Sequence, residues 1–498
     1  MSQIRRQSII STGLVYIGFA IGFINTYFFT RQGFFTESQY GLTALFTNIA
    51  NLMFAFANFG MISTVYKFYP YYKDNLEKKK NDLPSWALLI STTGFILVTI
   101  AGLIFKDLVI RKFGRSPELL QYYFWIFPFG FFLCMFAILE VFAWNIKKSI
   151  VSTFMREVLF KGITSILILL YIIKVIKSFD LFIKLYSFTY SIIVITLLSY
   201  LIYRKEFYIT LSISRVTRKF YKKILSLVSL VYLGGIVLMI AQVIEVIVIA
   251  SLVGSAAAGV YALGSIAAGL IQAPQRGTVA ASTAILSQSW KDKDYNKIAL
   301  IYQRSGINLL IASLAIFILI WLSFHDAVMV FHLKAAYLQS EWIFFFLGLA
   351  KIVDLGTGVN STIIGTSTYW RFELISGIIL VFLVIPLTYI LVKKYGIIGA
   401  GYSNLASFTI YNLIRIIFLK RKFNMHPFSW NTVLSILLAI GCYYLAYFSG
   451  RYLHGFGGIL LRSTIFILSF GFLALYLKLS PDFEPVWLTI KRRVGLRN

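Results

Sequence analysis

A polar stripe runs along an apolar stretch of the chain, residues 254–277. The stripe consists of Ser265, Gly269, Gln272 and Arg276. Their spacing of three or four residues puts them on one face of a helix. A guanidinium at membrane depth must face protein, water or a ligand, and its fork of donors matches the oxygens of a pyrophosphate. Two interpretations are open: a packing seam of small residues with a paired arginine, or the wall of a cavity for an anionic substrate.

Three more basic residues, Arg156, Lys161 and Lys351, lie inside apolar stretches. Each is costly at membrane depth unless it is paired or hydrated. Arg156 and Lys161 can snorkel to the headgroups, and Lys351 can pair with Asp354 on the next turn of the same helix. For all three residues, the alternative is a role in binding an anionic substrate. Arg276 differs from them because the sequence places no acidic residue within one turn of it.

Acidic and amide side chains form the other candidate groups. Glu245 lies at membrane depth with Gln242 one turn before it. A carboxylate there is suited to carrying a proton or a cation, and a structural hydrogen bond is the alternative. A second polar stripe, which includes Asn51, offers hydroxyl and amide groups suited to sugars; its members are Thr43, Thr47, Asn51 and Asn58.

The composition requires a membrane protein. Hydrophobic residues make up 59% of the 498 residues and charged residues 13%, about half the usual charged fraction of soluble proteins. The formal net charge is +28, which in a soluble protein would suggest nucleic acid. Here the basic residues lie mostly in short loops between apolar stretches, so anionic lipids and membrane orientation explain them, and no nucleic-acid partner is expected.

The hydropathy pattern predicts an all-α polytopic protein with fourteen transmembrane helices. The expected spans are 9–30, 40–61, 84–105, 120–142, 150–173, 181–203, 224–251, 258–287, 305–324, 341–364, 370–392, 397–418, 429–448 and 458–477. Of the 47 Lys and Arg, thirty fall on the side of the two termini, thirteen on the other side and four at membrane depth. This bias predicts that both termini are cytoplasmic.

Two groups of basic residues depart from that bias, because they flank the third and fifth spans on the predicted external side. The first group is Lys106, Arg111, Lys112 and Arg115, and the second is Lys174, Lys177 and Lys184. The orientation therefore rests on the total rather than on every loop.

The chain contains a weak internal repeat. Tyr40-Gly41-Leu42 returns as Tyr261-Ala262-Leu263, and Trp125-Ile126-Phe127 returns as Trp342-Ile343-Phe344. A repeat of six helices keeps both copies in the same orientation, related by a pseudo-twofold axis along the membrane normal. The expected domains are a first six-helix lobe at 1–210, a second at 211–424, and two extra helices with a basic tail at 425–498.

Several motifs resemble those of polysaccharide flippases, a family of the multidrug, oligosaccharidyl-lipid and polysaccharide (MOP) exporter superfamily. They are Thr30-Arg31-Gln32-Gly33 with Glu37-Ser38-Gln39-Tyr40-Gly41-Leu42, the run from Ala257 to Pro274, Gly358-Val359-Asn360-Ser361-Thr362-Ile363-Ile364 with Tyr369-Trp370-Arg371, and Tyr395-Gly396-Ile397-Ile398-Gly399-Ala400-Gly401. The resemblance covers essentially the whole chain. It implies a bacterial inner-membrane carrier that moves an undecaprenyl-pyrophosphate-linked oligosaccharide, such as an O-antigen unit of lipopolysaccharide, to the outer leaflet by alternating access.

On this interpretation the expected partners are the lipid-linked oligosaccharide, anionic membrane lipids and a coupling proton or sodium ion. The substrate-binding candidates are Arg276, Gln272, Arg31, Asn51, Arg156, Lys161 and Lys351, and the ion-coupling candidates are Glu245 and Asp354. Glu245 stands where many relatives are expected to have Asp, which leaves the coupling ion open.

Enzymatic chemistry finds little support in the sequence. No phosphate-binding glycine loop of the Walker type occurs, and the four histidines lack metal-ligand spacing, so neither a cofactor nor a metal is expected. An antiporter of drugs or metabolites from the same superfamily is the nearest alternative; it is expected to have twelve helices and often an acid in its first helix, where residues 9–30 have none. A membrane-bound polysaccharide polymerase or ligase is the second alternative, and it would need a large external loop.

Overall fold

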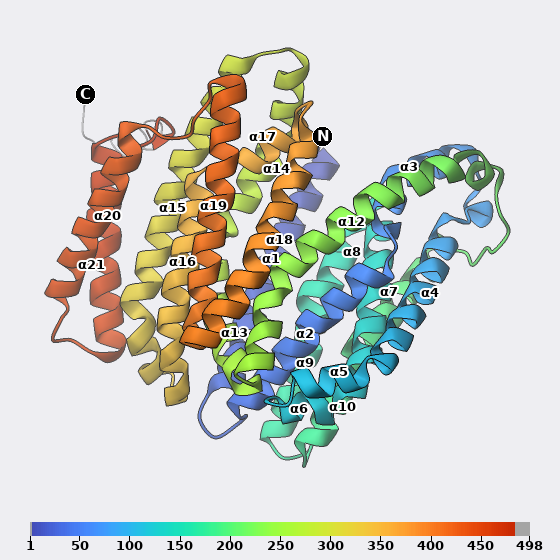
Figure 1. Ribbon diagram of the computed structural model, residues 1–498, viewed down its shortest axis with the longest axis horizontal. Helices are drawn as coiled ribbons and strands as arrows, with labels where there is room; N and C mark the ends of the chain where they lie inside the picture. The colour runs from blue at the N-terminus through green and yellow to red at the C-terminus, as the bar shows by residue number, and fades with distance from the viewer. Residues whose placement is uncertain (1, 484–498) are drawn as a thin grey trace. The chain divides into compact units, whose positions relative to one another are not determined.

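The computed structural model describes residues 2–483, which form helices joined by short loops (Figure 1). In lipid, a helix satisfies the hydrogen bonds of its own backbone, which explains why so apolar a chain adopts this fold. The chain divides into two compact units, Met1–Gly259 and Val260–Asn498.

The first unit is built around α7, which packs against α2, α4 and α11. Its α-helices are α1 (Ser2–Thr30), α2 (Glu37–Ala57), α3 (Met61–Asn75), α4 (Leu83–Ile104), α5 (Lys106–Lys112), α6 (Pro117–Gln121), α7 (Ile126–Asn145), α8 (Ser149–Phe154), α9 (Phe160–Ile172), α10 (Phe179–Ser187), α11 (Thr189–Tyr203) and α12 (Arg215–Leu252). A π-helical turn, η3 (Met155–Leu159), joins α8 to α9, and two short 3₁₀ turns are η1 (Lys78–Lys80) and η2 (Tyr123–Trp125).

Helix α12, which the expected division at 211 would assign to the second lobe, packs on α2 and α3 of the first unit. Its start is held by Asp82, a fully buried residue just before α4. One carboxylate oxygen of Asp82, Oδ2, accepts hydrogen bonds from the backbone N–H of Ser214 (2.9 Å) and from Oγ1 of Thr217 (2.7 Å). The loop before α12 is thereby fixed to the turn that precedes α4.

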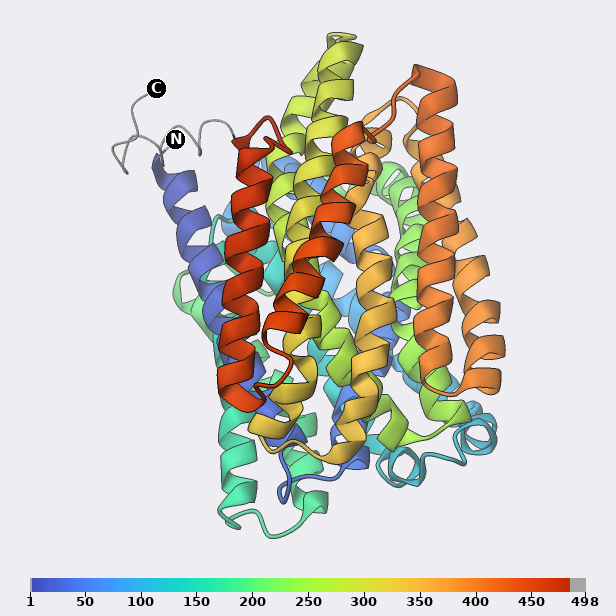
Figure 2. The same ribbon diagram turned by 90° about the vertical axis from the view of Figure 1, so that its left-hand side faces the viewer.

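The second unit contains a layer formed by α15, α16, α18 and α19, with a C-terminal pair against α15. Its helices are α13 (Ser255–Ile271), whose first turn belongs to the first unit, α14 (Ala273–Lys291), α15 (Tyr295–Val330), the 3₁₀ turn η4 (Ala335–Leu338), α16 (Gln339–Gly356), α17 (Asn360–Thr366), α18 (Trp370–Tyr395), α19 (Ile398–Phe423), α20 (Trp430–Ser449) and α21 (Gly455–Tyr476). Figure 2 shows α20 and α21 beside each other and next to α15.

Among the described residues, eleven helices are long and apolar enough to cross a membrane, or up to twelve if the bent pair α13 and α14 counts as one span. The other two expected spans are helical as well. The span expected at 150–173 consists of α8, η3 and α9, each too short to qualify alone, and the span expected at 397–418 is α19, which ends in a basic turn.

Close backbone contact joins α2 to the first turn of α13. A Cβ on Gly41 would lie 1.8 Å from the carbonyl oxygen of Ser255, and a Cβ on Gly259 would lie 2.4 Å from that of Glu37. Glycine is required at both positions because any side chain would collide with backbone. The Gly41 motif that the sequence singled out therefore serves helix packing.

Candidate functional site

Charged side chains from α7, η3 and α9 meet in the first unit. Arg156 on η3 donates from Nη1 to Oε2 of Glu140 on α7 (3.0 Å) and from Nε to Oε1 of Glu157 (3.2 Å). Lys161 on α9 donates from Nζ to Oε2 of Glu157 (2.9 Å). Two acids and two bases thus compensate one another, as charges at membrane depth require.

This charge cluster also binds α1. Lys161 donates to the carbonyl oxygen of Gly18 (3.0 Å), and the amide of Asn25 donates to the carbonyl oxygen of Lys161 (2.9 Å). Ser165 donates in turn to Oδ1 of Asn25 (2.6 Å). Gly18 is needed for this approach, since a Cβ there would lie 2.8 Å from Glu157.

The backbone conformation at Arg156 and Glu157 is itself unusual. Both residues lie in the π-helical turn η3, which interrupts the helix between α8 and α9. Single π-turns inserted in α-helices are frequent at functional sites. Here the turn carries the two residues that link α7 to α9 and α1.

The four side chains differ sharply in accessibility. The side chain of Glu140 is 8% exposed, whereas that of Arg156 is 41% exposed. The second oxygen of Glu140, Oε1, is buried and has no hydrogen-bond partner among the described residues. An accessible guanidinium with a buried carboxylate behind it can bind an anion, and the unpartnered oxygen can accept a proton.

A second polar network lies in the second unit, around Arg415 on α19. The Arg415 side chain is 2% exposed and pairs with Glu373 on α18. Its Nε donates to Oγ of Ser376 (3.2 Å), its Nη1 donates to Oδ1 of Asn360 (3.3 Å), and its guanidinium lies over the ring of Tyr411 at 3.9 Å from the centroid. A buried charge with this many partners fixes α18 and α19 together.

Asn360 extends the network to Asp354, one of the predicted ion-coupling residues. The amide of Asn412 donates to Oδ1 of Asp354 (3.0 Å), and Oδ1 of Asn412 accepts from Asn360 (2.9 Å) and from the hydroxyl of Thr357 (2.9 Å). Oxygen atoms of a carboxylate, an amide and a hydroxyl therefore lie close together, at the end of α16 and on α19. Such oxygen atoms suit a hard cation. Among the described residues, no group of three or more His, Cys, Asp or Glu could hold a metal ion.

Lys351 does not form the intrahelical pair expected with Asp354. Its ammonium lies over the ring of Phe408 at 5.1 Å from the centroid, and no ion pair joins it to Asp354 within the described part of the chain. The physical reason is that Asp354 is already bound by Asn412 from the neighbouring helix. Lys351 keeps an aromatic partner rather than a carboxylate.

The stripe that ends at Arg276 is divided between two helices. The span expected at 258–287 is helical but bent, because the chain turns by 43° between α13 and α14. The break falls at Gln272, two residues before Pro274, which lies in the first turn of α14, where a missing N–H is tolerated. Ser265 thus lies on α13, whereas Arg276 lies exposed on α14.

The other predicted residues lie apart in the first unit. Arg31 follows the end of α1, with its guanidinium 5.5 Å and 5.3 Å from the ring centroids of Tyr27 and Phe34. Asn51 is half-buried on α2, and Glu245 is 6% exposed on α12. Of the predicted residues in this unit, Arg156 and Lys161 share a partner, which is Glu157.

Sequence reasoning missed two buried arginines. Arg415 and Arg462 lie inside the expected spans 397–418 and 458–477, yet the count of basic residues assigns neither of them to membrane depth. Arg415 is buried in α19, and Arg462 of α21 pairs with the buried Asp326 of α15. The helical spacing of Tyr411, Asn412 and Arg415 could have indicated a polar face on α19. No comparable pattern surrounds Arg462 on its own helix, so its partner on α15 could not be inferred.

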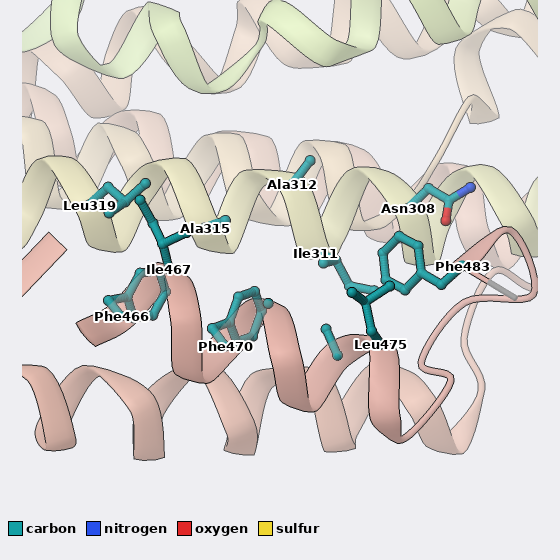
Figure 3. Close-up of a pocket in the computed structure, with 12 residues that line it drawn as sticks. Asn308, Ile311, Ala312, Ala315, Leu319, Phe466, Ile467, Phe470, Leu475 and Phe483 are labelled. Carbon is teal, nitrogen blue, oxygen red and sulfur yellow. The ribbon is translucent and has the colours of Figure 1, made fainter. Parts of the chain in front are cut away.

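An apolar groove of about 400 Å³ lies between α15 and α21 (Figure 3). Ile311, Ala312 and Ala315 line it from α15, and Phe466 and Phe470 line it from α21. Asn308 is the polar residue at one end, so the groove offers no charged group to a substrate. The charge clusters remain the stronger candidates for function.

Searches of family models and of curated proteins found no match to the sequence. Solved structures do match. The lipid II flippase MurJ, in an inward closed conformation, is 15% identical; the match covers 94% of this chain and 99% of that one, with a TM-score of 0.70. An inward-facing multidrug resistance MATE family transporter of the MOP superfamily is 14% identical, covering 84% and 98% of the two chains, with a TM-score of 0.66.

A MOP superfamily transporter from Pyrococcus furiosus, described as having a binding pocket of reversed polarity, is 14% identical; coverage is 84% and 95%, and the TM-score is 0.58. At these identities the similarity establishes the fold alone. The chain is a multi-pass membrane protein with the fold of MOP transporters. The structures that it resembles are those of transporters, not enzymes.

Proposed function

We propose that this protein is a MOP superfamily transporter that moves a lipid-linked oligosaccharide across the bacterial inner membrane by alternating access. The expected substrate is an undecaprenyl-pyrophosphate-linked sugar unit, and the direction is from the cytoplasmic to the outer leaflet. Both termini are placed in the cytoplasm, as the bias of basic residues favours.

The observation that carries the proposal is the length of the matches. The flippase match covers 94% of this chain, whereas the multidrug transporter match covers 84%. The difference is about a tenth of the chain, close to the length of the segment that holds α20 and α21 (Trp430–Ser449 and Gly455–Tyr476). A C-terminal helix pair beyond the expected twelve fits the flippase branch better than the antiporter branch.

The helical content supports the full fourteen-span arrangement as part of the proposal. Each expected span has a helical counterpart among the described residues. The repeated Trp-Ile-Phe motif lies at the start of α7 and near the start of α16, and each of these helices is followed by an interrupted helical segment, α8–η3–α9 and α17–α18. Two six-helix lobes, at 1–210 and 211–424, followed by a C-terminal segment at 425–498, remain our model of the evolutionary repeat.

Basic side chains supply the affinity for a pyrophosphate in this proposal. The guanidinium of Arg156 is partly exposed, and Arg276 is exposed on α14. Guanidinium groups bind phosphate oxygens through two parallel hydrogen bonds, which favours arginine over lysine at such sites. Asn51 and Gln272 are the neutral groups that we assign to the sugar.

A cation-coupled antiporter is the second candidate. The groups that would bind its coupling ion are the oxygen-rich network of Asp354, Asn412 and Thr357, together with the buried Glu245. Such groups could couple transport to a proton or sodium gradient in either kind of carrier. They therefore address the energy source rather than the substrate.

Translocation in proteoliposomes tests the proposal. The purified full-length protein is reconstituted with a fluorescent undecaprenyl-pyrophosphate-linked oligosaccharide, and access of an external quencher to the fluorophore is followed over time. We expect the protein to accelerate equilibration between the leaflets relative to protein-free liposomes. Equal rates with and without protein, combined with gradient-driven efflux of a cationic dye, would favour the antiporter.

A further inference from the structure

The predicted external side of the first unit contains more basic residues than the orientation bias explains. Some of them have structural partners. Arg115 donates to the carbonyl oxygen of Leu252, Lys106 lies over the ring of Phe124 at 4.8 Å, and Lys184 pairs with Asp180 at 2.7 Å. Lys174 and Lys177 form no ion pair among the described residues, and both side chains are exposed.

These two lysines line one cavity of about 480 Å³. The cavity is formed where the loop after α9 meets the loop between α1 and α2, and its other lining residues are Gly33, Phe34, Tyr171, Ile172 and Ile176. All belong to the first unit. Two cations and two aromatic rings thus share a cavity at the end of the helices α1 and α9.

The aromatic side of the cavity is rigidly supported. The ring of Tyr171 stacks on that of Phe35 at 4.7 Å, and Phe35 in turn lies 5.2 Å from Phe182. Phe34, half-buried at the cavity, also carries the guanidinium of Arg31 at 5.3 Å from its ring centroid. Arg31 therefore adds a third positive charge beside the cavity.

The acid nearest to these lysines along the chain does not neutralise them. Asp180 follows Lys177 by three residues, but its carboxylate is bound by Lys184 from the next turn of α10. None of the described residues that line the cavity is acidic, so it keeps a net positive charge next to two half-buried aromatic rings. Phosphate and carboxylate groups pair with such lysines as point charges, and sugar rings pack on flat apolar faces.

We infer that this cavity is a binding subsite for an acidic saccharide, a sugar unit that carries carboxylate groups. The inference rests on the proposed function, in which this side of the protein faces the outside, so that the subsite would receive the sugar portion as it leaves. It assigns a substrate class, because two lysines beside two aromatic rings in one cavity complement carboxylates carried on sugar rings. The same chemistry could be supplied by anionic lipid headgroups, and the experiment separates the two sources.

Binding is measured with the full-length protein in nanodiscs of zwitterionic phosphatidylcholine, which lack anionic headgroups. The probes are trigalacturonate and a neutral trisaccharide, titrated by calorimetry at low salt. We expect trigalacturonate to bind more tightly, and Lys174→Gln/Lys177→Gln to lower its affinity about tenfold, since two partly solvated charge pairs contribute about 1.4 kcal/mol together. Phe34→Leu should lower the affinity for both probes, because it removes a ring face without changing the charge.

The matched control is Arg111→Gln/Lys112→Gln, which removes two exposed basic residues on the same predicted side but outside the cavity. It should leave trigalacturonate binding unchanged. Equal losses in the control and in Lys174→Gln/Lys177→Gln would overturn the inference, because general surface charge would then explain binding. So would the absence of saccharide binding in phosphatidylcholine together with lysine-dependent retention of phosphatidylglycerol, which would assign the cavity to headgroups.

Translocation of the lipid-linked substrate by the unmodified protein tests the proposed function separately. If the unmodified protein translocates substrate but binds acidic and neutral saccharides equally, this inference alone fails. If it binds trigalacturonate in a lysine-dependent manner but accelerates no translocation, the subsite stands and the proposed function fails.

Discussion

Arg156 donates from Nη1 to Oε2 of Glu140 over 3.0 Å, and this bond joins the π-turn η3 to α7. Glu140 is 6% exposed, so it depends on that partner for compensation of its charge. The relationship makes the two residues unequal: losing the arginine leaves a buried charge, whereas losing both partners leaves none.

Arg156→Gln should therefore destabilise the protein more than Arg156→Gln combined with Glu140→Gln. We expect a loss of about 1–3 kcal/mol for the single variant, at the low end because Arg156 is partly exposed, and a partial recovery in the double variant. Thermal unfolding of the purified variants in the same detergent gives the order of their stabilities. A double variant less stable than the single one would contradict a charge-compensating role.

Gly41→Ala should destabilise the contact between α2 and α13, because the new Cβ would lie 1.8 Å from the carbonyl oxygen of Ser255. Overpacking of this kind costs about 1–3 kcal/mol or more. Gly162→Ala is the control, since nothing lies within 4 Å of a Cβ there. The melting temperature of the detergent-solubilised protein should fall for Gly41→Ala only. Equal melting temperatures for the two variants would contradict the close approach of α2 and α13.

Arg276→Ala should slow the clearance of undecaprenyl-linked intermediates from the cytoplasmic side of the membrane. Charged hydrogen bonds contribute about 1.5–3 kcal/mol each, which corresponds to a change of about ten- to a hundredfold. Arg276→Lys keeps the charge but not the two-pronged geometry and should fall in between. The rate of clearance is measured in cells with matched membrane abundance of each variant. If Arg276→Ala clears the intermediates at the rate of the unmodified protein, Arg276 does not bind the substrate and the packing-seam interpretation is favoured.

Glu245→Gln should remove the response of transport to an imposed ion gradient while preserving the fold, because the amide keeps the shape of the side chain. Glu245 is buried at membrane depth on α12. Proteoliposome transport is compared with and without proton and sodium gradients, with Asp354→Asn as the parallel variant. An unchanged gradient response in Glu245→Gln would exclude Glu245 as the coupling residue. Loss of the gradient response in Asp354→Asn alone would assign ion coupling to Asp354 in the second unit.

Reporter fusions should place Lys79, Arg215 and the C-terminus in the cytoplasm and a fusion after Gly254 outside. The motivation is the excess of thirty basic residues over thirteen. Each site is fused in turn to a reporter that is active in the periplasm and to one that is active in the cytoplasm, so that either location gives a positive signal. A cytoplasmic signal after Gly254 would overturn the fourteen-span topology.

Much of the fold could be predicted from the sequence because long apolar stretches have few alternatives to a helix in lipid. The positions at which the helices break were harder to predict from the sequence. Pro274 lies only two residues after the bend at Gln272, yet a proline in an apolar run is compatible with either a kink or a continuous helix. The π-turn at Arg156 leaves no trace in the pattern of apolar residues.

The candidate site was predicted less completely, because helical spacing reveals neighbours on one helix and not partners on another. Arg156 and Lys161 were recognised as charges that needed compensation, but the partner Glu140 lies sixteen residues before Arg156 and on a different helix. The spacing favours an ion pair between Lys351 and Asp354, whereas each has a partner on α19. Which pairs form is decided by tertiary packing.

The ion pair between Asp326 and Arg462 has a consequence for biosynthesis. Arg462 lies in the first half of α21, the last helix in the described part of the chain, and an arginine in an apolar span raises the cost of inserting that span, by about 2.5–3.5 kcal/mol at the helix centre and by less toward its ends. Asp326 belongs to α15, which is already in the membrane at that time. The carboxylate of Asp326, which is synthesised earlier, therefore favours stable insertion of α21, and a nascent chain without that carboxylate would retain α21 in the membrane less well.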